Sequence, residues 1–153
     1  MTHNKFVNEP QPEAVDAIRA WYRLQRATQA LGAHIRSQLG LTGEQLALLR
    51  IIGERDAWPL AQLRSRLDMH PATLGQSLAR LEERGLVDVS VDTSDRRRRT
   101  IALRAEGLAV LSQAPHAGPG TLRAQRHEPE RLRRLADAFD DAVVLFGLEE
   151  WAS

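Results

Sequence analysis

The sequence predicts a mostly α-helical fold with one small β-hairpin, and three observations support this. Apolar residues recur every three or four positions over most of the chain, which is the spacing of amphipathic helices. Between Gly85 and Arg104 the period changes to two, which indicates strands. Glycines and prolines stand where these patterns stop, and the 42% hydrophobic content is sufficient for a core.

Two helices are predicted before the middle of the chain. The first begins at Pro12 and stops at Gly40, a residue typical of helix C-termini. The second opens with a capping box, in which Thr42 and Gln45 satisfy each other's free amides, and ends near Asp56. The apolar stripe of the first helix consists of Ala14, Ile18, Trp21, Thr28, Leu31, Ile35 and Leu39.

Two further helices are joined by a tight connection. The first is short and covers residues 60–67, and residues 68–70 form the connection. Pro71 suits the first position of the next helix, which extends to about Arg84 and is stopped by Gly85. We expect Leu74, Leu78 and Leu81 to face the core.

The hairpin is predicted over residues 86–104. Residues 86–91 form one strand, residues 93–95 have turn chemistry, and residues 100–103 form the return strand. Four consecutive arginines, residues 96–99, stand at or just after the tip. On a strand their side chains would alternate between the two faces. We expect Trp58, beside Pro59, to pack at a turn.

The C-terminal third contains two predicted helices separated by a break. One helix covers residues 105–114, and the prolines and glycines of residues 115–120 interrupt it. The last helix begins at Pro129. Its apolar face consists of Leu132, Leu135, Ala136, Phe139, Val143 and Phe146.

Composition excludes several classes of protein. The chain has no cysteine, which excludes disulfides, thiol catalysis and cysteine-ligated zinc. No apolar run is long enough to span a membrane, and the N-terminus lacks the layout of a signal peptide. A cytoplasmic location is therefore the expected one. We expect residues 1–10 to be frayed.

The charge distribution is more informative than the net charge of +1. Residues 61–104 contain nine arginines and six acidic residues, so basic charge gathers in the middle of the chain. A tight helix pair followed by a basic hairpin is typical of a head that reads duplex DNA.

The second helix of this pair has the side chains that a major groove accepts. Once its leucines face the core, the exposed face carries small and hydrogen-bonding residues. Gln76 suits adenine, and Arg80 suits guanine or phosphate. The free amides after Pro71 can meet a phosphate. Arginines at the hairpin tip suit a narrow minor groove, where the potential is most negative.

The segment MHPATLGQSLARLEERGLVDVSVDTSDRRRRTIALRAEGLAVL resembles the core of the MarR family of bacterial transcription factors. The match is carried by RLEERGLV, by Asp95-Arg96-Arg97 and by the helix start that contains Glu106-Gly107. The resemblance implies a homodimer with one winged-helix head per subunit. It also implies that Asp95 braces Arg97, which touches DNA. Many members are repressors released by small aromatic ligands.

This resemblance, together with the residue pattern, predicts one domain over residues 1–153. Residues 12–40 and 121–150 would be dimerisation helices, residues 42–104 the winged helix-turn-helix, and residues 105–114 a connecting helix. We expect double-stranded DNA and a second copy of the chain as partners, and no cofactor. The predicted DNA-binding residues are Arg64, Ser65, Pro71, Ala72, Thr73, Gln76, Ser77, Arg80, Asp95, Arg96, Arg97 and Arg98.

The chain departs from the family pattern in three places. Gly75 and Gln76 stand where a hydroxyl residue and an arginine are frequent. Leu103-Arg104 replaces the usual Leu-Thr, and residues 115–120 interrupt a helix that is often continuous. The first departure keeps a second hypothesis open, in which the head docks a protein instead of DNA.

Other chemistry has little support in the sequence. The five histidines are scattered, so we expect no metal site. A hydrolase would need a catalytic constellation near His116, and no such motif is visible. Trp21 and His34 on the first helix are candidates to line an effector pocket, with core or dimer contact as the alternative.

Overall fold

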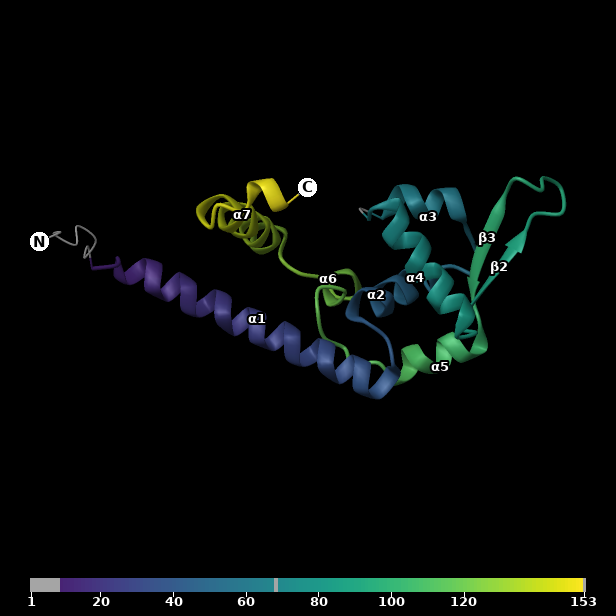
Figure 1. Ribbon diagram of the computed structural model, residues 1–153, viewed down its shortest axis with the longest axis horizontal. Helices are drawn as coiled ribbons and strands as arrows, with labels where there is room; N and C mark the ends of the chain where they lie inside the picture. The colour runs from purple at the N-terminus through teal and green to yellow at the C-terminus, as the bar shows by residue number, and fades with distance from the viewer. Residues whose placement is uncertain (1–8, 68, 153) are drawn as a thin grey trace, which may run out of the picture. The chain divides into compact units, whose positions relative to one another are not determined.

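The computed structural model describes residues 9–67 and 69–152 (Figure 1). The expected fraying of residues 1–8 and the part of the tight connection at position 68 lie outside the described residues. The chain forms two compact units, one within residues 1–116 and one within residues 117–153. The boundary falls inside the predicted break at residues 115–120, where proline and glycine interrupt the helical pattern.

The first helix, α1, covers Pro12–Leu39 and ends as predicted. Gly40 adopts a left-handed conformation with φ of 65°, and its amide donates to the Arg36 carbonyl. Only the C-terminal end of α1 is buried, through Ile35 and Leu39. The apolar stripe therefore contributes to the core of the first unit over its last turns alone.

The helix α2 covers Gly43–Ile52 and begins with the predicted capping box. The Gln45 amide donates to the Thr42 hydroxyl at 3.1 Å, and the Thr42 amide donates to the Gln45 side chain at 3.0 Å. The helix ends several residues before the expected Asp56, because the chain must extend again to pair Trp58 with a strand.

The helix-turn-helix pair consists of α3, Leu60–Arg66, and α4, Pro71–Glu83. Both agree with the predicted boundaries to within one residue. Pro71 occupies the first turn of α4, and Gly85 follows the helix with φ of 69°. The leucines at positions 74, 78 and 81 are buried, as their spacing predicted.

A three-stranded antiparallel sheet with the order β1-β3-β2 completes the first unit. The predicted hairpin is β2, Val87–Val91, and β3, Arg99–Leu103, with Val89 opposite Ile101. The third strand, β1, is only Trp58–Pro59 and was not predicted, because two residues carry no periodicity. Trp58 is 1% exposed, and its indole N–H donates to the carbonyls of Ile51 and Ile52.

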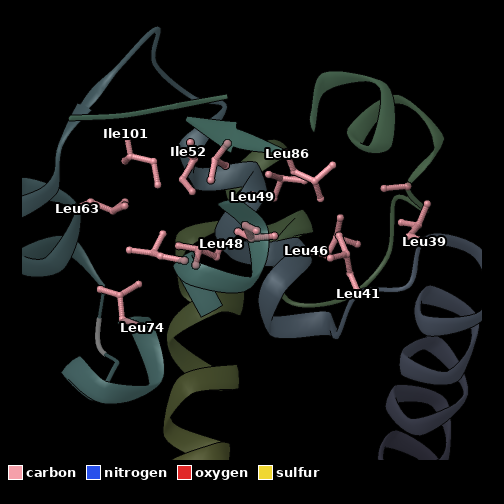
Figure 2. Packing of buried hydrophobic residues seen from close by; sticks show 14 of the residues in the cluster. Leu39, Leu41, Leu46, Leu48, Leu49, Ile52, Leu63, Leu74, Leu86 and Ile101 are labelled. Atoms are coloured by element: carbon pink, nitrogen blue, oxygen red, sulfur yellow. The ribbon is translucent and has the colours of Figure 1, made fainter. Parts of the chain in front are cut away.

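The core lies between the helices and the sheet of the first unit (Figure 2). Helix α3 packs against β1 and β3, while α4 packs against β2 and α2. The buried side chains come from Ile35 to Ala114 and from no residue earlier or later in the described chain. The labelled members are Leu39, Leu41, Leu46, Leu48, Leu49, Ile52, Leu63, Leu74, Leu86 and Ile101.

The helix α5, Ala105–Gln113, closes the base of the hairpin. The Arg104 amide before it donates to the Leu86 carbonyl at 3.0 Å. A Cβ at Gly107 would overlap that same carbonyl and the Leu103 side chain, so this position requires glycine. The arginine of α2, Arg50, reaches across and donates to the Pro115 carbonyl just after α5.

The second unit contains α6, Thr121–Ala124, α7, Pro129–Leu145, and the short 3-10 helix η1, Glu149–Trp151. The sequence predicted α7 but not α6, so the segment 121–150 is not one continuous helix. The apolar face of α7 is exposed at Leu135 and Phe139, and Phe146, directly after the helix, is exposed as well. Across both described ranges, no helix is long and apolar enough to cross a membrane.

Candidate nucleic-acid interface

The exposed face of α4 is the one the leucine spacing predicted. Thr73, Gln76 and Arg80 are all exposed, as are Pro71 and Ala72 at the start of the helix. Gly75 lies on the same exposed side, with open space around it. The helix therefore presents a shallow surface on which few side chains extend far from the backbone.

Ser77 does not belong to this face, and its inclusion among the DNA-binding residues was wrong. It is 8% exposed and is buried along with Leu74, Leu78 and Leu81. Positions 74, 77, 78 and 81 follow the three- and four-residue spacing of one helix side, so Ser77 points with the leucines. We remove it from the candidate interface.

The start of α4 has a cap that the sequence analysis missed. The His70 side chain accepts a hydrogen bond from the Ala72 amide through Nδ1 at 3.2 Å. Pro71 has no amide to offer, and the Leu74 amide donates to the His70 carbonyl. The expectation that several free amides await a phosphate here is therefore reduced to the Thr73 amide. Histidine is an uncommon N-cap, so no pattern in the sequence pointed to it.

Arg80 already has a partner on its own helix. Its guanidinium lies 3.2 Å from the Glu83 carboxylate, one turn further along α4. Both side chains are exposed, so the pair is weak and easily exchanged for another anion. Only one guanidinium nitrogen of Arg80 makes this contact, so its other N–H donors can still bind guanine or phosphate. Gln76 makes no such contact within the described chain.

The arginine run lies in the turn of the hairpin and not along a strand. The Arg98 amide donates to the Asp95 carbonyl at 2.9 Å, which closes a turn over Arg96 and Arg97. Only Arg99 belongs to β3. The expected alternation of four arginines between two faces is therefore wrong, because a turn has no such periodicity. Arg96, Arg97 and Arg98 are exposed at the tip.

Asp95 holds this turn in shape. One carboxylate oxygen accepts from the Arg97 amide at 3.0 Å, and the other lies 3.5 Å from the Arg98 guanidinium. The brace between Asp95 and Arg97 thus acts through the main chain, and the side-chain ion pair is with Arg98 instead. The Arg97 guanidinium has no ion-pair partner in the described part of the chain.

A second carboxylate orders the other side of the turn. Asp92 accepts from the Ser94 hydroxyl at 2.6 Å and from the Ser94 amide at 2.8 Å. The hydroxyl bond, followed by the amide bond, holds the pKa of Asp92 below its ordinary value of 3.8. The Asp92 amide also donates to the Arg98 carbonyl, so both ends of the arginine turn are fixed.

The remaining predicted contacts lie on α3. Arg64 and Ser65 are exposed, and the Ser65 hydroxyl donates to the Gln62 carbonyl at 3.0 Å. The Ser65 hydroxyl can still accept a second hydrogen bond. The Arg64 guanidinium, near the C-terminal end of α3, has no ion-pair partner among the described residues.

The candidate effector residues are not brought together within this chain. Trp21 and His34 are both exposed and lie thirteen positions apart on the continuous helix α1. At about 1.5 Å per residue, their backbones are separated by roughly 20 Å. The rings of Trp21 and its neighbour Tyr22 lie with their centroids 4.6 Å apart. The described residues also contain no group of histidine and acidic side chains that could hold a metal ion.

The helix pair α3–α4 and the hairpin β2–β3, whose tip presents arginines, define a winged helix-turn-helix protein. The sequence model of the MarR family matches residues 41–98. The transcriptional regulator HosA of Escherichia coli is 36% identical over 97 residues, which are 63% of this chain and 72% of HosA. The chain belongs to the MarR family, which consists of transcriptional regulators and not of enzymes.

Solved structures show the same fold. A probable transcriptional regulator from Pseudomonas aeruginosa is 30% identical and has a TM-score of 0.56, over 77% of this chain and 94% of that one. A mutant of MarR from E. coli, complexed with operator DNA, is 19% identical with a TM-score of 0.58, over 86% and 96% of the two chains. The predicted fold class and family are therefore confirmed.

Proposed function

We propose that this protein is a sequence-specific repressor that binds double-stranded DNA as a homodimer. The observation that carries the proposal is the pairing of two surfaces on one unit: the exposed face of α4 and the arginine turn held by Asp95. The operator complex of the E. coli MarR mutant, a protein of the same fold, supports DNA as the partner.

Base recognition falls mainly to Gln76. Its amide is the longest polar side chain on the exposed face that has no partner on α4, and it suits bidentate pairing with adenine. Arg80 would contribute guanine or phosphate binding through the guanidinium donors that do not contact Glu83. Pro71, Ala72 and Thr73 are short enough to let the start of α4 approach the base edges.

The arginine turn supplies the second contact, in a minor groove. Arg96 and Arg97 project from the tip, and Asp95 fixes the backbone that carries them. A preformed turn loses less conformational entropy on binding than a free loop. Each phosphate that the head neutralises releases counterions, so the affinity will fall steeply with salt.

Dimerisation is proposed from the apolar residues that each unit leaves exposed. They include Ile18, Trp21, Tyr22 and Leu24 on α1, Leu135 and Phe139 on α7, and Phe146 directly after α7. Apolar residues that gather on one exposed helix face are typical of protein interfaces. A twofold dimer places two copies of α4 on half-sites about one helical turn (~10 bp) apart.

Regulation by an effector is part of the proposal. A small aromatic molecule bound near α1 would release DNA by changing the distance between the two heads, since only unequal affinity for two arrangements shifts the equilibrium. Because Trp21 and His34 are far apart on one chain, a pocket that contains both requires the second copy. The proposed cytoplasmic location follows from the DNA partner.

The test is binding to palindromic sequences from the protein's own promoter. We expect wild type to shift the operator at low salt, Gln76→Ala to lose discrimination between sequences, and Arg97→Ala to weaken all duplexes. Asp141→Ala, an exposed change outside the head, serves as the control. Absence of any complex at low salt would contradict the proposal. Retention of a protein partner by Arg97→Ala without duplex binding would favour the docking-module hypothesis.

A further inference from the structure

A cleft of about 670 Å³ opens between the start of α3 and the hairpin. It is lined by residues of two segments: Pro59 and the α3 residues Leu60, Ala61, Gln62 and Arg64, and the hairpin residues Asp92, Arg97, Arg98, Arg99 and Thr100. Figure 1 shows α3 beside the hairpin, within the same unit. The volume is typical of small-molecule sites, which range from about 300 to 1,000 Å³. None of the DNA contacts described above uses this concave surface as a whole.

Positive charge gathers inside the cleft. Four arginines line it, and the only carboxylate among its lining residues is Asp92. Asp92 accepts two hydrogen bonds from Ser94, and Arg98 is paired with Asp95. The other three arginines, Arg64, Arg97 and Arg99, have no ion-pair partner in the described part of the chain. A concave wall concentrates the field of these unpaired cations and attracts an anion.

Beside Gln62 and Arg64, the α3 side of the cleft also offers the apolar surface of Pro59, Leu60 and Ala61, so the cleft suits an anion that carries a nonpolar body. A deoxyribose ring has apolar edges that can lie against Leu60 and Ala61, while its phosphate faces the arginines. Arg64 comes from α3 and Arg99 from β3, so they approach a bound phosphate from two different elements. Guanidinium groups match phosphate oxygens in geometry as well as in charge.

We propose that this cleft binds a sugar phosphate, with Arg64 and Arg99 as its phosphate ligands. Arg99 is thereby added to the predicted DNA-binding residues. The proposal rests on the proposed function where it takes the sugar phosphate to be part of a strand of the bound duplex. That strand would lie between the major groove bound by α4 and the minor groove bound by the arginine turn. A free nucleotide carries the same chemistry and is distinguished by experiment.

The experiment uses the full chain and the variants Arg64→Gln and Arg99→Gln. The control is Arg104→Gln, which removes the same charge from an exposed arginine that pairs with Glu106 and does not line the cleft. Duplex binding is measured over a range of salt concentrations. Thymidine 5′-monophosphate is titrated separately, without DNA, by calorimetry. Thermal melts confirm that each variant is folded.

We expect each cleft variant to lose about tenfold in duplex affinity equally on operator and unrelated sequences. The slope of log affinity against log salt should fall by about 1, and the control should behave as wild type. Loss of duplex affinity without nucleotide binding identifies the DNA strand as the source. Nucleotide binding that both variants abolish identifies a free nucleotide.

The proposal is overturned if both variants retain the wild-type affinity and salt slope and wild type binds no nucleotide. In that case a loss of sequence discrimination in Gln76→Ala would still uphold the proposed function. Conversely, nucleotide binding that depends on Arg64 and Arg99, in a protein that binds no duplex, would support the cleft and contradict the proposed repressor.

Discussion

The head and the two ends of this chain bury their apolar residues very differently. Within residues 35–114, leucines, isoleucines and a tryptophan pack into one core that is closed by a sheet. In residues 9–34 and 115–152, no residue is buried, although Trp21, Phe139 and Trp151 stand there. Both regions are helical, and both have regular apolar spacing.

The difference shows that amphipathic spacing predicts a helix but does not predict which surface packs against its apolar face. In the head, residues 35–114, the strands and loops cover the apolar faces of the helices. The apolar residues of α7, and those of α1 before its last turns, stay largely exposed, and we propose that the second copy covers them. Stability of the head and association of the ends should therefore respond to different substitutions.

The largest expected effect is on the core of the head. Trp58→Ala should lower the free energy of unfolding by about 3–5 kcal/mol, because it leaves a large cavity and removes a buried indole hydrogen bond. Urea denaturation checks this. Leu108→Ala, an apolar change at a position on α5 that is 62% exposed, should cost under about 0.5 kcal/mol. Equal costs would contradict the assigned core.

A change on α7 should act on association. Phe139→Glu places a charge in the proposed interface and should raise the dimer dissociation constant by at least about 30-fold, or about 2 kcal/mol. Sedimentation equilibrium measures it. Asp137→Ala, on the opposite side of the helix, should leave the constant unchanged. A Phe139→Glu protein that dimerises like wild type would remove α7 from the interface.

Two glycines of the head should respond in opposite directions. A Cβ meets nothing within 4 Å at either Gly75 or Gly85, but only Gly85 has a positive φ, of 69°. Gly75→Ala should stabilise α4 by about 0.5–1 kcal/mol. Gly85→Ala should destabilise the head by about 1–2 kcal/mol. Thermal unfolding checks both, and the same sign for both would show that backbone conformation does not decide the outcome.

The smallest effect concerns Asp92 in the wing. Because its pKa in the folded protein lies below 3.8, its hydrogen bonds stabilise the fold above that pH and lose this contribution as pH falls through the lowered value. Ser94→Ala removes the hydroxyl bond, which is the largest cause of the lowered pKa. We expect the Asp92 titration, followed by NMR of the carboxyl carbon, to move up toward 3.8; an unchanged midpoint would contradict the assignment.

Much of the fold was predictable because its signals are local. The capping box at Thr42, the stop at Gly40 and the leucine spacing of α4 each depend on a few neighbouring residues. The strand β1 and the glycine at position 107 were not predictable in this way. Trp58 is a strand residue only because Ile101, far along the chain, pairs with it, and Gly107 is required only because the Leu86 carbonyl lies beside it.

The candidate site also contains features with a local sequence signal and features that depend on distant contacts. The helical spacing correctly predicted that Thr73, Gln76 and Arg80 are exposed. The same spacing, applied to Ser77, predicts that it is buried with the leucines. The arginine turn, the His70 cap and the cleft between α3 and the wing depend on backbone geometry or on contacts between distant segments. Residue type alone does not encode them.

Hydroxyl-radical footprinting of the protein on its own promoter is the most direct test of the central claim that two heads grip one duplex. We predict two protected half-sites about 10 bp apart, related by a twofold axis, with flanking minor-groove protection that Arg97→Ala removes. A single protected patch, or flanking protection that Arg97→Ala leaves intact, would contradict the account.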